Sequence, residues 1–252
     1  MLSKVDTLKG YRLHAIDGEL GTIKEFFFDD QHWTVRYLVA ETGNWLHERQ
    51  VLISPLDLGL LNSQRQHIAV NLSKKQIADS PSLDTDKPVS RQFEESYHMF
   101  FGWPMYWDGA NSWGNYPFLV QAREKGKTPP ATGTSWNPFL RSTEDVAGHI
   151  IHATDGEIGH VEDFLIDPET WTIRYLVVDT RNWWEGRRVL VSPNWIGKID
   201  WDSASVWVNL SREAIKASPE YTDGIELDRE YESALHQHYN SMGYWDSERD
   251  AS

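Results

Sequence analysis

The 252-residue chain contains no cysteine, which excludes disulfide bonds, iron–sulfur clusters and thiolate chemistry. It also has no apolar run near the length of about 20 residues that a membrane-spanning helix needs. Its first ten residues lack the apolar core of a signal peptide. We therefore expect a soluble protein that works in the cytoplasm.

Basic residues are scarce and scattered. The chain has 24 Lys and Arg against 38 Asp and Glu, for a net charge of -14. Residues 139–252 hold 10 basic and 22 acidic side chains, whereas residues 1–108 hold 11 and 15. Proteins that follow a phosphate backbone usually present a basic face. The composition therefore argues against general nucleic-acid binding and predicts a solvated acidic surface.

The patterns of common enzymes are missing as well. The sequence has no Gly-x-Ser-x-Gly elbow and no glycine-rich phosphate loop. His14 and His152 stand apart from other residues at metal-ligand spacing, and His236 and His238 point away from each other on a helix. We expect no enzymatic activity, no cofactor and no metal.

The sequence does contain a long internal repeat. Its halves share the pairs HAIDGELG and HATDGEIG, WTVRYLVAETGNW and WTIRYLVVDTRNW, and VLISP and VLVSP, all 138 residues apart. Between residues 10–81 and 148–219, 31 of 72 positions are identical without a gap. The tails match too, since Arg91, Glu94 and His98 recur as Arg229, Glu232 and His236, and YWD recurs at the end of each half. The chain therefore reads as a tandem duplication.

The repeat divides the chain into three parts. Residues 1–108 form the first unit, 109–138 the linker, and 139–252 the second unit with its tail. The linker contains GKTPPATGTS, a composition unsuited to a hydrophobic core.

Each unit reads as a small β structure followed by helices. Alternating and β-branched segments bounded by turn residues predict five strands, at Tyr11–Ile16, Gly21–Asp29, Trp33–Glu41, Arg49–Ser54 and Gln66–Leu72. Ser73, followed three residues later by Gln76, predicts a helix N-cap. A longer helix is expected at Val89–Phe101, and its apolar face would carry Phe93, Tyr97, Phe100 and Phe101. In the second unit that face would carry Tyr231, Leu235 and Tyr239. The fold class is thus mainly β, with two SH3-like barrels that each precede C-terminal helices.

Several of these residues resemble a known family. Gly10, Asp17-Gly18, Gly21, Asp29 and Arg36-Tyr37-Leu38-Val39 follow the order and spacing of the PRC-barrel domain. The second unit repeats the set at Gly148, Asp155-Gly156, Gly159, Asp167 and Arg174-Tyr175-Leu176-Val177. The family is named for the cytoplasmic domain of the photosynthetic reaction-centre H subunit, and it includes bacterial proteins of unknown function.

The resemblance implies an interaction module rather than an enzyme. The leading hypothesis is a non-enzymatic scaffold whose protein partner is unknown. The alternative is an accessory of a photosynthetic or other bioenergetic membrane complex, peripherally associated and involved in proton handling, although the chain lacks the membrane helix of the H subunit. A third possibility is an enzyme acting on a small ligand between the barrels.

The acidic and basic residues of the motif also have ordinary structural interpretations. Asp17, Asp29, Asp155 and Asp167 lie at predicted turns, where aspartate bonds to the backbone, although paired carboxylates could also serve acid–base chemistry. Arg36 and Arg174 lie within strands, where we expect each head group to pair with a carboxylate such as Asp29.

Tryptophan is abundant, with 13 residues. Trp33 and Trp171 are expected to pack inside the barrels. The candidate partner surface combines loop tryptophans with nearby arginines, the residue types that often anchor interfaces: Trp45, Arg49, Trp183, Trp184 and Arg187. These side chains could instead pack between the two units or against the C-terminal helices.

The repeat makes two further predictions. Gly18 and Gly156 should adopt positive φ in tight turns. The two barrels should pair within the chain about an approximate two-fold axis, with the aromatic helices near the junction. Helices that fold back on their own barrels would be the other outcome.

Overall fold

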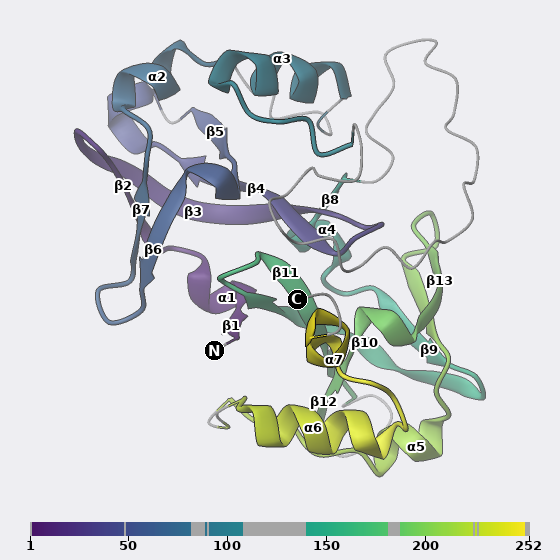
Figure 1. Ribbon diagram of the computed structural model, residues 1–252. Helices are drawn as coiled ribbons and strands as arrows, with labels where there is room; N and C mark the ends of the chain where they lie inside the picture. Colours follow the sequence, from purple (N-terminus) through teal and green to yellow (C-terminus); the bar gives the residue numbers. More distant parts are fainter. Residues whose placement is uncertain are drawn as a thin grey trace. The chain divides into compact units, whose positions relative to one another are not determined.

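The computed structural model describes residues 2–47, 49–81, 89, 91–107, 140–180, 187–223, 225 and 227–249 (Figure 1). The expected linker at 109–138 lies outside these residues. Residues 9–140 form one compact unit, which we call the first unit. Residues 1–8 and 141–252 form the other, the second unit. This division differs from the expected one, because residues 1–8 belong with the second unit.

The first unit is built on a six-stranded sheet. Its strands are β2 (Arg12–Ala15), β3 (Gly18–Asp29), β4 (Thr34–Glu41), β5 (Gln50–Ile53), β6 (Leu58–Asn62) and β7 (His67–Val70). They are ordered β6-β7-β2-β3-β4-β5, and the only parallel pair among these described strands is β2–β7. The prediction of a mainly β fold is confirmed. The prediction missed β6, which follows a 3₁₀ turn at Pro55–Asp57.

The second unit repeats this sheet. Its strands are β9 (Ile150–Ala153), β10 (Gly156–Asp167), β11 (Thr172–Asp179), β12 (Arg188–Val191), β13 (Ile196–Asp200) and β14 (Ser205–Val208). Each begins and ends 138 residues after its counterpart. It also contains β1 (Ser3–Lys4) and α1 (Val5–Leu8), whose sequence counterparts are β8 (Leu140–Ser142) and α4 (Thr143–Val146).

The long second strand of each sheet bends at irregularities of its register. In β3 the pairing with β4 shifts between Ile23 and Glu25 and again between Phe27 and Phe28. The pairing of β10 with β11 shifts at the matching positions. Such bulges increase the twist of a strand. Strand β3 pairs with β2 along its first half and with β4 along its second half.

Glycines permit the turn and a close backbone approach. Gly18 and Gly156 have φ of +139° and +143°, which confirms the prediction of positive φ. Gly21 has φ of +147°, and a Cβ there would overlap the backbone carbonyl of Glu41 on the neighbouring strand. Gly159 makes the same approach to the carbonyl of Asp179. Only glycine fits these two positions without moving the backbone.

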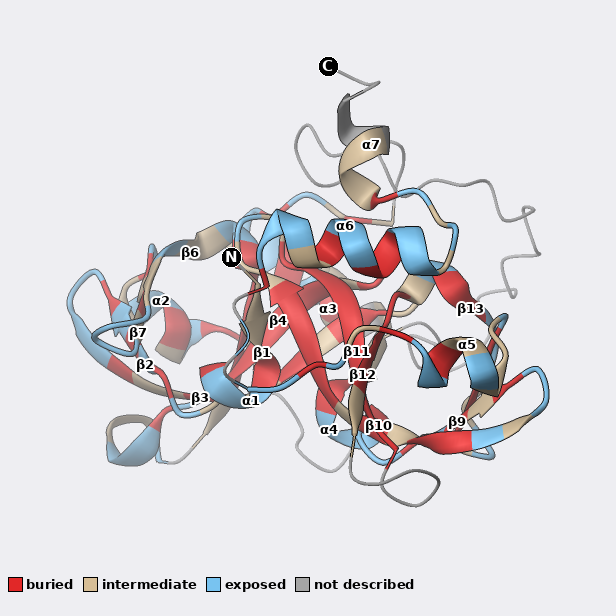
Figure 2. Cartoon of the chain, turned by 90° about the horizontal axis from the view of Figure 1, so that it is seen from below, coloured by how far each residue is buried: buried red, intermediate tan, exposed pale blue. Residues whose placement is uncertain are grey.

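Each sheet buries an apolar core. In β11 every residue is buried, as the strand in Figure 2 shows. Trp33 and Trp171 are both buried as expected, and Trp33 stacks on Phe28 with the ring centroids 5.3 Å apart.

Helices follow each sheet, as predicted. In the first unit they are α2 (Lys74–Asp79) and α3 (Arg91–Phe101); in the second they are α5 (Arg212–Lys216), α6 (Arg229–His238) and α7 (Tyr244–Arg249). Ser73 and Gln76 form the predicted capping box at the start of α2. No helix among the described residues is long and apolar enough to cross a membrane.

The aromatic helix α3 folds back on its own sheet. Tyr97 is buried, and its hydroxyl donates to the carbonyl oxygen of Leu52 in β5 at 3.0 Å. Of the four aromatic residues expected on one buried face, Phe100 is instead exposed. The helix therefore belongs to the core of its own unit, and the two-fold pairing of the barrels stays a prediction.

Candidate functional site

The motif aspartates organise turns and helix starts. Asp17 accepts a hydrogen bond at 2.8 Å from the backbone N–H of Lys74, the first residue of α2, and Asp155 does the same for Arg212 at the start of α5. Asp29 accepts from the backbone N–H groups of residues 31 and 32. These contacts match the expected structural role.

Each motif arginine pairs with a motif aspartate. Arg36 lies 2.9 Å from Asp29, and Arg174 lies 3.0 Å from Asp167, which confirms the predicted pairing. Burial alone would raise the pKa of Asp29, but the hydrogen bond from His32 and the nearby charge of Arg36 outweigh it and lower the pKa to about 2. Asp29 is therefore a carboxylate at neutral pH.

The same arginine leads into a buried polar cluster in the first unit. The Arg36 guanidinium lies 4.2 Å from the centroid of the Tyr106 ring. Tyr106 donates to Glu94 Oε1 at 2.5 Å, and Tyr37 donates to the same oxygen at 3.0 Å. Glu94 is fully buried, and its other oxygen lies 3.4 Å from Arg91. A strand, a helix and the segment after the helix thus converge on one carboxylate.

His98 completes the cluster. Its Nδ1 lies 2.9 Å from the carbonyl oxygen of Pro104, so this nitrogen carries a proton. Burial lowers the pKa of His98 to about 4, so the ring is neutral at pH 7 and Nε2 is an acceptor. Tyr37 lies 2.6 Å from Nε2 and can donate to it. The single hydroxyl proton of Tyr37 is therefore shared between two acceptors, His98 and Glu94.

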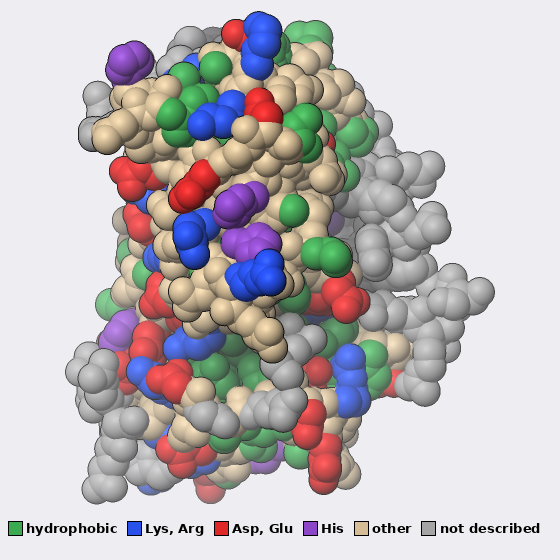
Figure 3. Space-filling view, turned by 90° about the vertical axis from the view of Figure 1, so that its left-hand side faces the viewer, with side chains coloured by type: hydrophobic (Ala, Val, Ile, Leu, Met, Phe, Trp, Pro, Cys, Tyr) green, Lys and Arg blue, Asp and Glu red, His purple; other side chains and the backbone are tan. Residues whose placement is uncertain are grey.

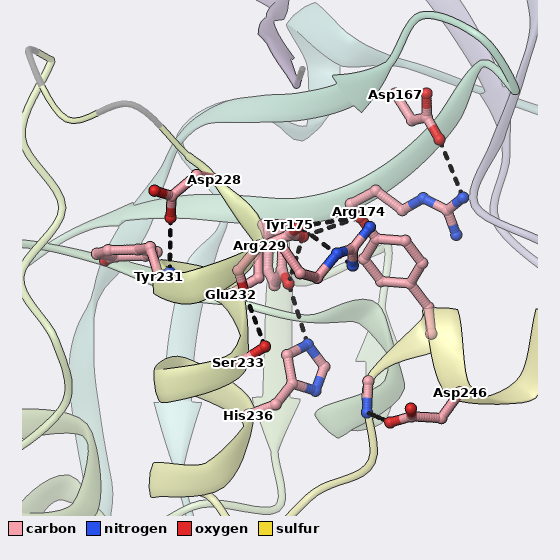
Figure 4. Close-up of polar contacts among 12 residues, drawn as sticks. Asp167, Arg174, Tyr175, Asp228, Arg229, Tyr231, Glu232, Ser233, His236 and Asp246 are labelled. Atoms are coloured by element: carbon pink, nitrogen blue, oxygen red, sulfur yellow. Dashed lines mark hydrogen bonds and ion pairs between the residues drawn. The ribbon is translucent and has the colours of Figure 1, made fainter.

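The second unit contains the same cluster, shown in Figure 4. Tyr175 lies 3.0 Å from both Glu232 Oε1 and His236 Nε2, and Tyr244 donates to Glu232 Oε1 at 2.9 Å. Arg174 lies over the Tyr244 ring at 3.8 Å, and Arg229 lies 3.3 Å from Glu232. We call these two sets the tyrosine–glutamate–histidine clusters.

A tryptophan lies beside each cluster, but it comes from a different segment in each unit. In the first unit Trp103, after the helix, donates its indole N–H to Asp57 at 2.5 Å. At the matching positions the second unit has Ser241 after the helix and Trp195 before β13, and this indole donates to the serine hydroxyl at 3.0 Å. Both arrangements keep an indole–oxygen hydrogen bond between the helix exit and the sheet.

The clusters hold the helices in place. Their glutamate oxygens, tyrosine hydroxyls and histidine nitrogens are partnered within the chain, and no group of three metal-binding side chains occurs among the residues that the structure describes. The clusters were not predicted from the sequence, although the repeat of Arg91, Glu94 and His98 was their signal. These residues stand at helical spacing on one face, and their counterparts recur 138 residues later.

The candidate partner surface is only partly described. Arg49 donates to the backbone carbonyl oxygens of Ala78, Ser80 and Pro81 at the end of α2, and Arg187 makes the equivalent contacts at the end of α5. Both arginines thus cap helices. Trp45 is half-buried and donates its indole N–H to a backbone carbonyl, with Lys74 over its ring. Trp183 and Trp184 lie outside the described residues, and the partner surface stays a prediction.

The two motif histidines that the repeat places at matching positions make ring contacts. His14 meets His67 edge to face with ring centroids 5.3 Å apart, and His152 stacks on Trp207 at 5.1 Å. On the face of the molecule in Figure 3, Lys and Arg side chains of the described residues are interspersed with Asp and Glu side chains.

Comparison with known proteins identifies part of the chain. The family model of the PRC-barrel domain matches residues 149–209, which span all of β9 to β14 together with the residue just before β9 and the residue just after β14. An uncharacterised protein of Deinococcus radiodurans is 35% identical over 89 residues, which is 35% of this chain and 30% of that protein. The match thus spans less than a third of that protein's length. Residues 149–209 thus match the PRC-barrel domain.

Proposed function

We propose that the protein is a cytoplasmic, non-enzymatic interaction module made of two PRC units, the second copy being residues 10–81. The repeated strand bounds, bulges and buried clusters support the second copy. The titratable groups of each cluster form hydrogen bonds and ion pairs with one another. This arrangement favours a structural role for these residues over a catalytic one.

The observation that carries the interaction function is a difference between the units. Among the residues of the first unit that the structure describes, the large apolar side chains that are exposed are Ile16, Leu56, Leu60, Met99 and Phe100. The matching residues of the second unit are all exposed and polar: Thr154, Asn194, Lys198, Gln237 and His238. Because the two units share a fold, folding does not require apolar side chains at these positions. Exposed apolar groups that the fold does not need commonly mark a binding surface.

A series of contacts links Phe100 to the residue next to Leu56. Phe100 lies against Phe101 with ring centroids 4.9 Å apart, and Phe101 stacks on Trp103 at 4.5 Å. Trp103 in turn bonds to Asp57, the neighbour of Leu56. We define the apolar surface as Leu56, Met99 and Phe100. Met99 is 69% exposed, so burying this surface against a protein partner would remove substantial apolar area from water.

The repeat supplies variants that should not disturb the fold. Met99→Gln with Phe100→His places the second unit's residues on the first unit. Ile16→Thr is the matched control, since it also replaces an exposed apolar residue by its counterpart, but outside the apolar surface. Wild type and both variants would be used to capture proteins from native cells, with quantitative mass spectrometry. We expect the double variant to lose partners that wild type and Ile16→Thr retain, and equal capture by all three would contradict the proposal.

A further inference from the structure

The first eight residues of the chain are built into the unit from which they are most distant in sequence. β1 pairs antiparallel with β10, in the register Ser3 opposite Ile166 and Lys4 opposite Leu165. The first unit begins directly after this segment, at residue 9. The segment is therefore held at this site by non-covalent contacts. Along the chain, the whole first unit separates the segment from the site.

The contacts are those of a specific docked segment. Val5 and Leu8 of α1 are each only 1% exposed. Lys4 Nζ lies 2.8 Å from Asp223 and 3.8 Å from the buried Asp163. The backbone N–H of Asp6 donates to Asp163 Oδ1 at 3.2 Å. Apolar anchors, an ion pair and backbone pairing thus act over a short stretch.

The site is a sheet edge that the segment covers. Leu165 pairs with Tyr175 of β11 on one side of β10 and with Lys4 of β1 on the other. Removing β1 and α1 would leave backbone groups of β10 unpaired and would uncover the apolar surface on which Val5 and Leu8 are buried. An exposed edge of this kind accepts an extended segment by strand addition.

From these contacts we infer that the edge of β10 also accepts residues 3–8 of a second copy of this chain, which gives a strand-exchanged dimer. Every copy carries one segment and one site, so the exchange keeps all the contacts above and forms no new interface. Gly10, with φ of +80°, follows the segment by two residues, at the start of the first unit. Protein concentration then decides between the intrachain and interchain forms. This inference does not depend on the proposed function.

The absence of native cysteine allows a direct test. Chains with Ser3→Cys would be mixed with chains with Ile166→Cys, each having one thiol, and then oxidised. Residues opposite each other in an antiparallel pair are close enough for a disulfide. A disulfide between these two positions in the mixture must join two different chains, and peptide mapping would identify it.

Three controls make each outcome informative. The chain with both substitutions should cross-link within itself, and failure to do so would overturn the pairing on which the inference depends. Mixing Ser3→Cys with Ser203→Cys, at an exposed turn, measures random collision. Adding Val5→Asp to the Ser3→Cys chain should reduce the mixed disulfide to the collision level. We expect that disulfide to exceed collision and to increase with concentration; a yield equal to collision at every concentration would overturn the inference.

Discussion

Replacing Glu94 by alanine tests the cluster that holds α3 on the first sheet. Glu94 is fully buried and accepts hydrogen bonds from Tyr37 and Tyr106 while pairing with Arg91. The substitution removes the acceptor of the buried Tyr106 hydroxyl and one of the two acceptors of Tyr37, and it leaves the arginine without this partner. An unsatisfied buried polar group costs about 1–3 kcal/mol, and breaking a buried ion pair costs about 3–5 kcal/mol. Because Tyr37 retains His98 as an acceptor, we expect a loss of about 3–4 kcal/mol.

The assay is equilibrium urea denaturation of the full chain, followed by tryptophan fluorescence and far-UV circular dichroism. The two units provide an internal reference, since Glu94→Ala should lower the midpoint of one transition and leave the other in place. Glu232→Ala should do the same to the other transition. Glu94→Gln keeps the shape of the side chain and one acceptor oxygen, so it should lower the free energy of unfolding less than Glu94→Ala does.

The control is Glu95→Ala, at the neighbouring half-buried position of the same helix. A surface substitution of this kind usually changes stability by at most about 0.5 kcal/mol. If Glu94→Ala and Glu95→Ala shifted the transitions equally, the cluster would not be what holds the helix, and the reasoning would fail.

Three further changes can be checked by the same denaturation measurement. Gly21→Ala should cost about 3 kcal/mol, because its Cβ would meet the backbone of Glu41, whereas Gly18→Val should cost about 1 kcal/mol or more through its positive φ alone; the reverse order would contradict the close approach. Arg49→Met should cost about 2 kcal/mol by leaving the carbonyl oxygens at the end of α2 without their donor, and no change would show that water replaces it. Burial raises the pKa of Asp163 from 3.8 to about 6, so the folded state favours its protonated form, and the second unit should lose about 2–3 kcal/mol as the pH rises from 4 to 7. Asp163→Asn should flatten this part of the pH profile, and an unchanged profile would contradict the assignment.

Local patterns predicted much of each unit. The strands were recognisable from β-branched and aromatic runs between turn residues, the start of α2 from Ser73 and Gln76, and the tight turn from Gly18. The pairing of Arg36 with Asp29 was predicted because an arginine within a strand, partly buried, needs a carboxylate as its partner. Strand β6 was missed because Leu58–Asn62 contains Gly59 and does not alternate between apolar and polar residues.

What the sequence did not reveal depends on contacts between distant segments. The place of residues 1–8 follows from pairing with β10, more than 150 positions away, and no local pattern encodes that choice. The tyrosine–glutamate–histidine clusters join a strand to a helix about 57 residues later. Phe100 was expected on the same apolar face as Tyr97, but the helix turns Tyr97 and His98 inward and leaves Phe100 at the surface.

The exposure of Phe100 also gives the account its most direct test. Hydrogen exchange of the full chain, alone and bound to a captured protein partner, would locate the interface. Binding at the apolar surface predicts slower exchange around residues 55–57 and 96–101, with no change at the matching residues 193–195 and 234–239. Equal protection of both units, or protection only in the second, would contradict the claim that the first unit carries the binding surface.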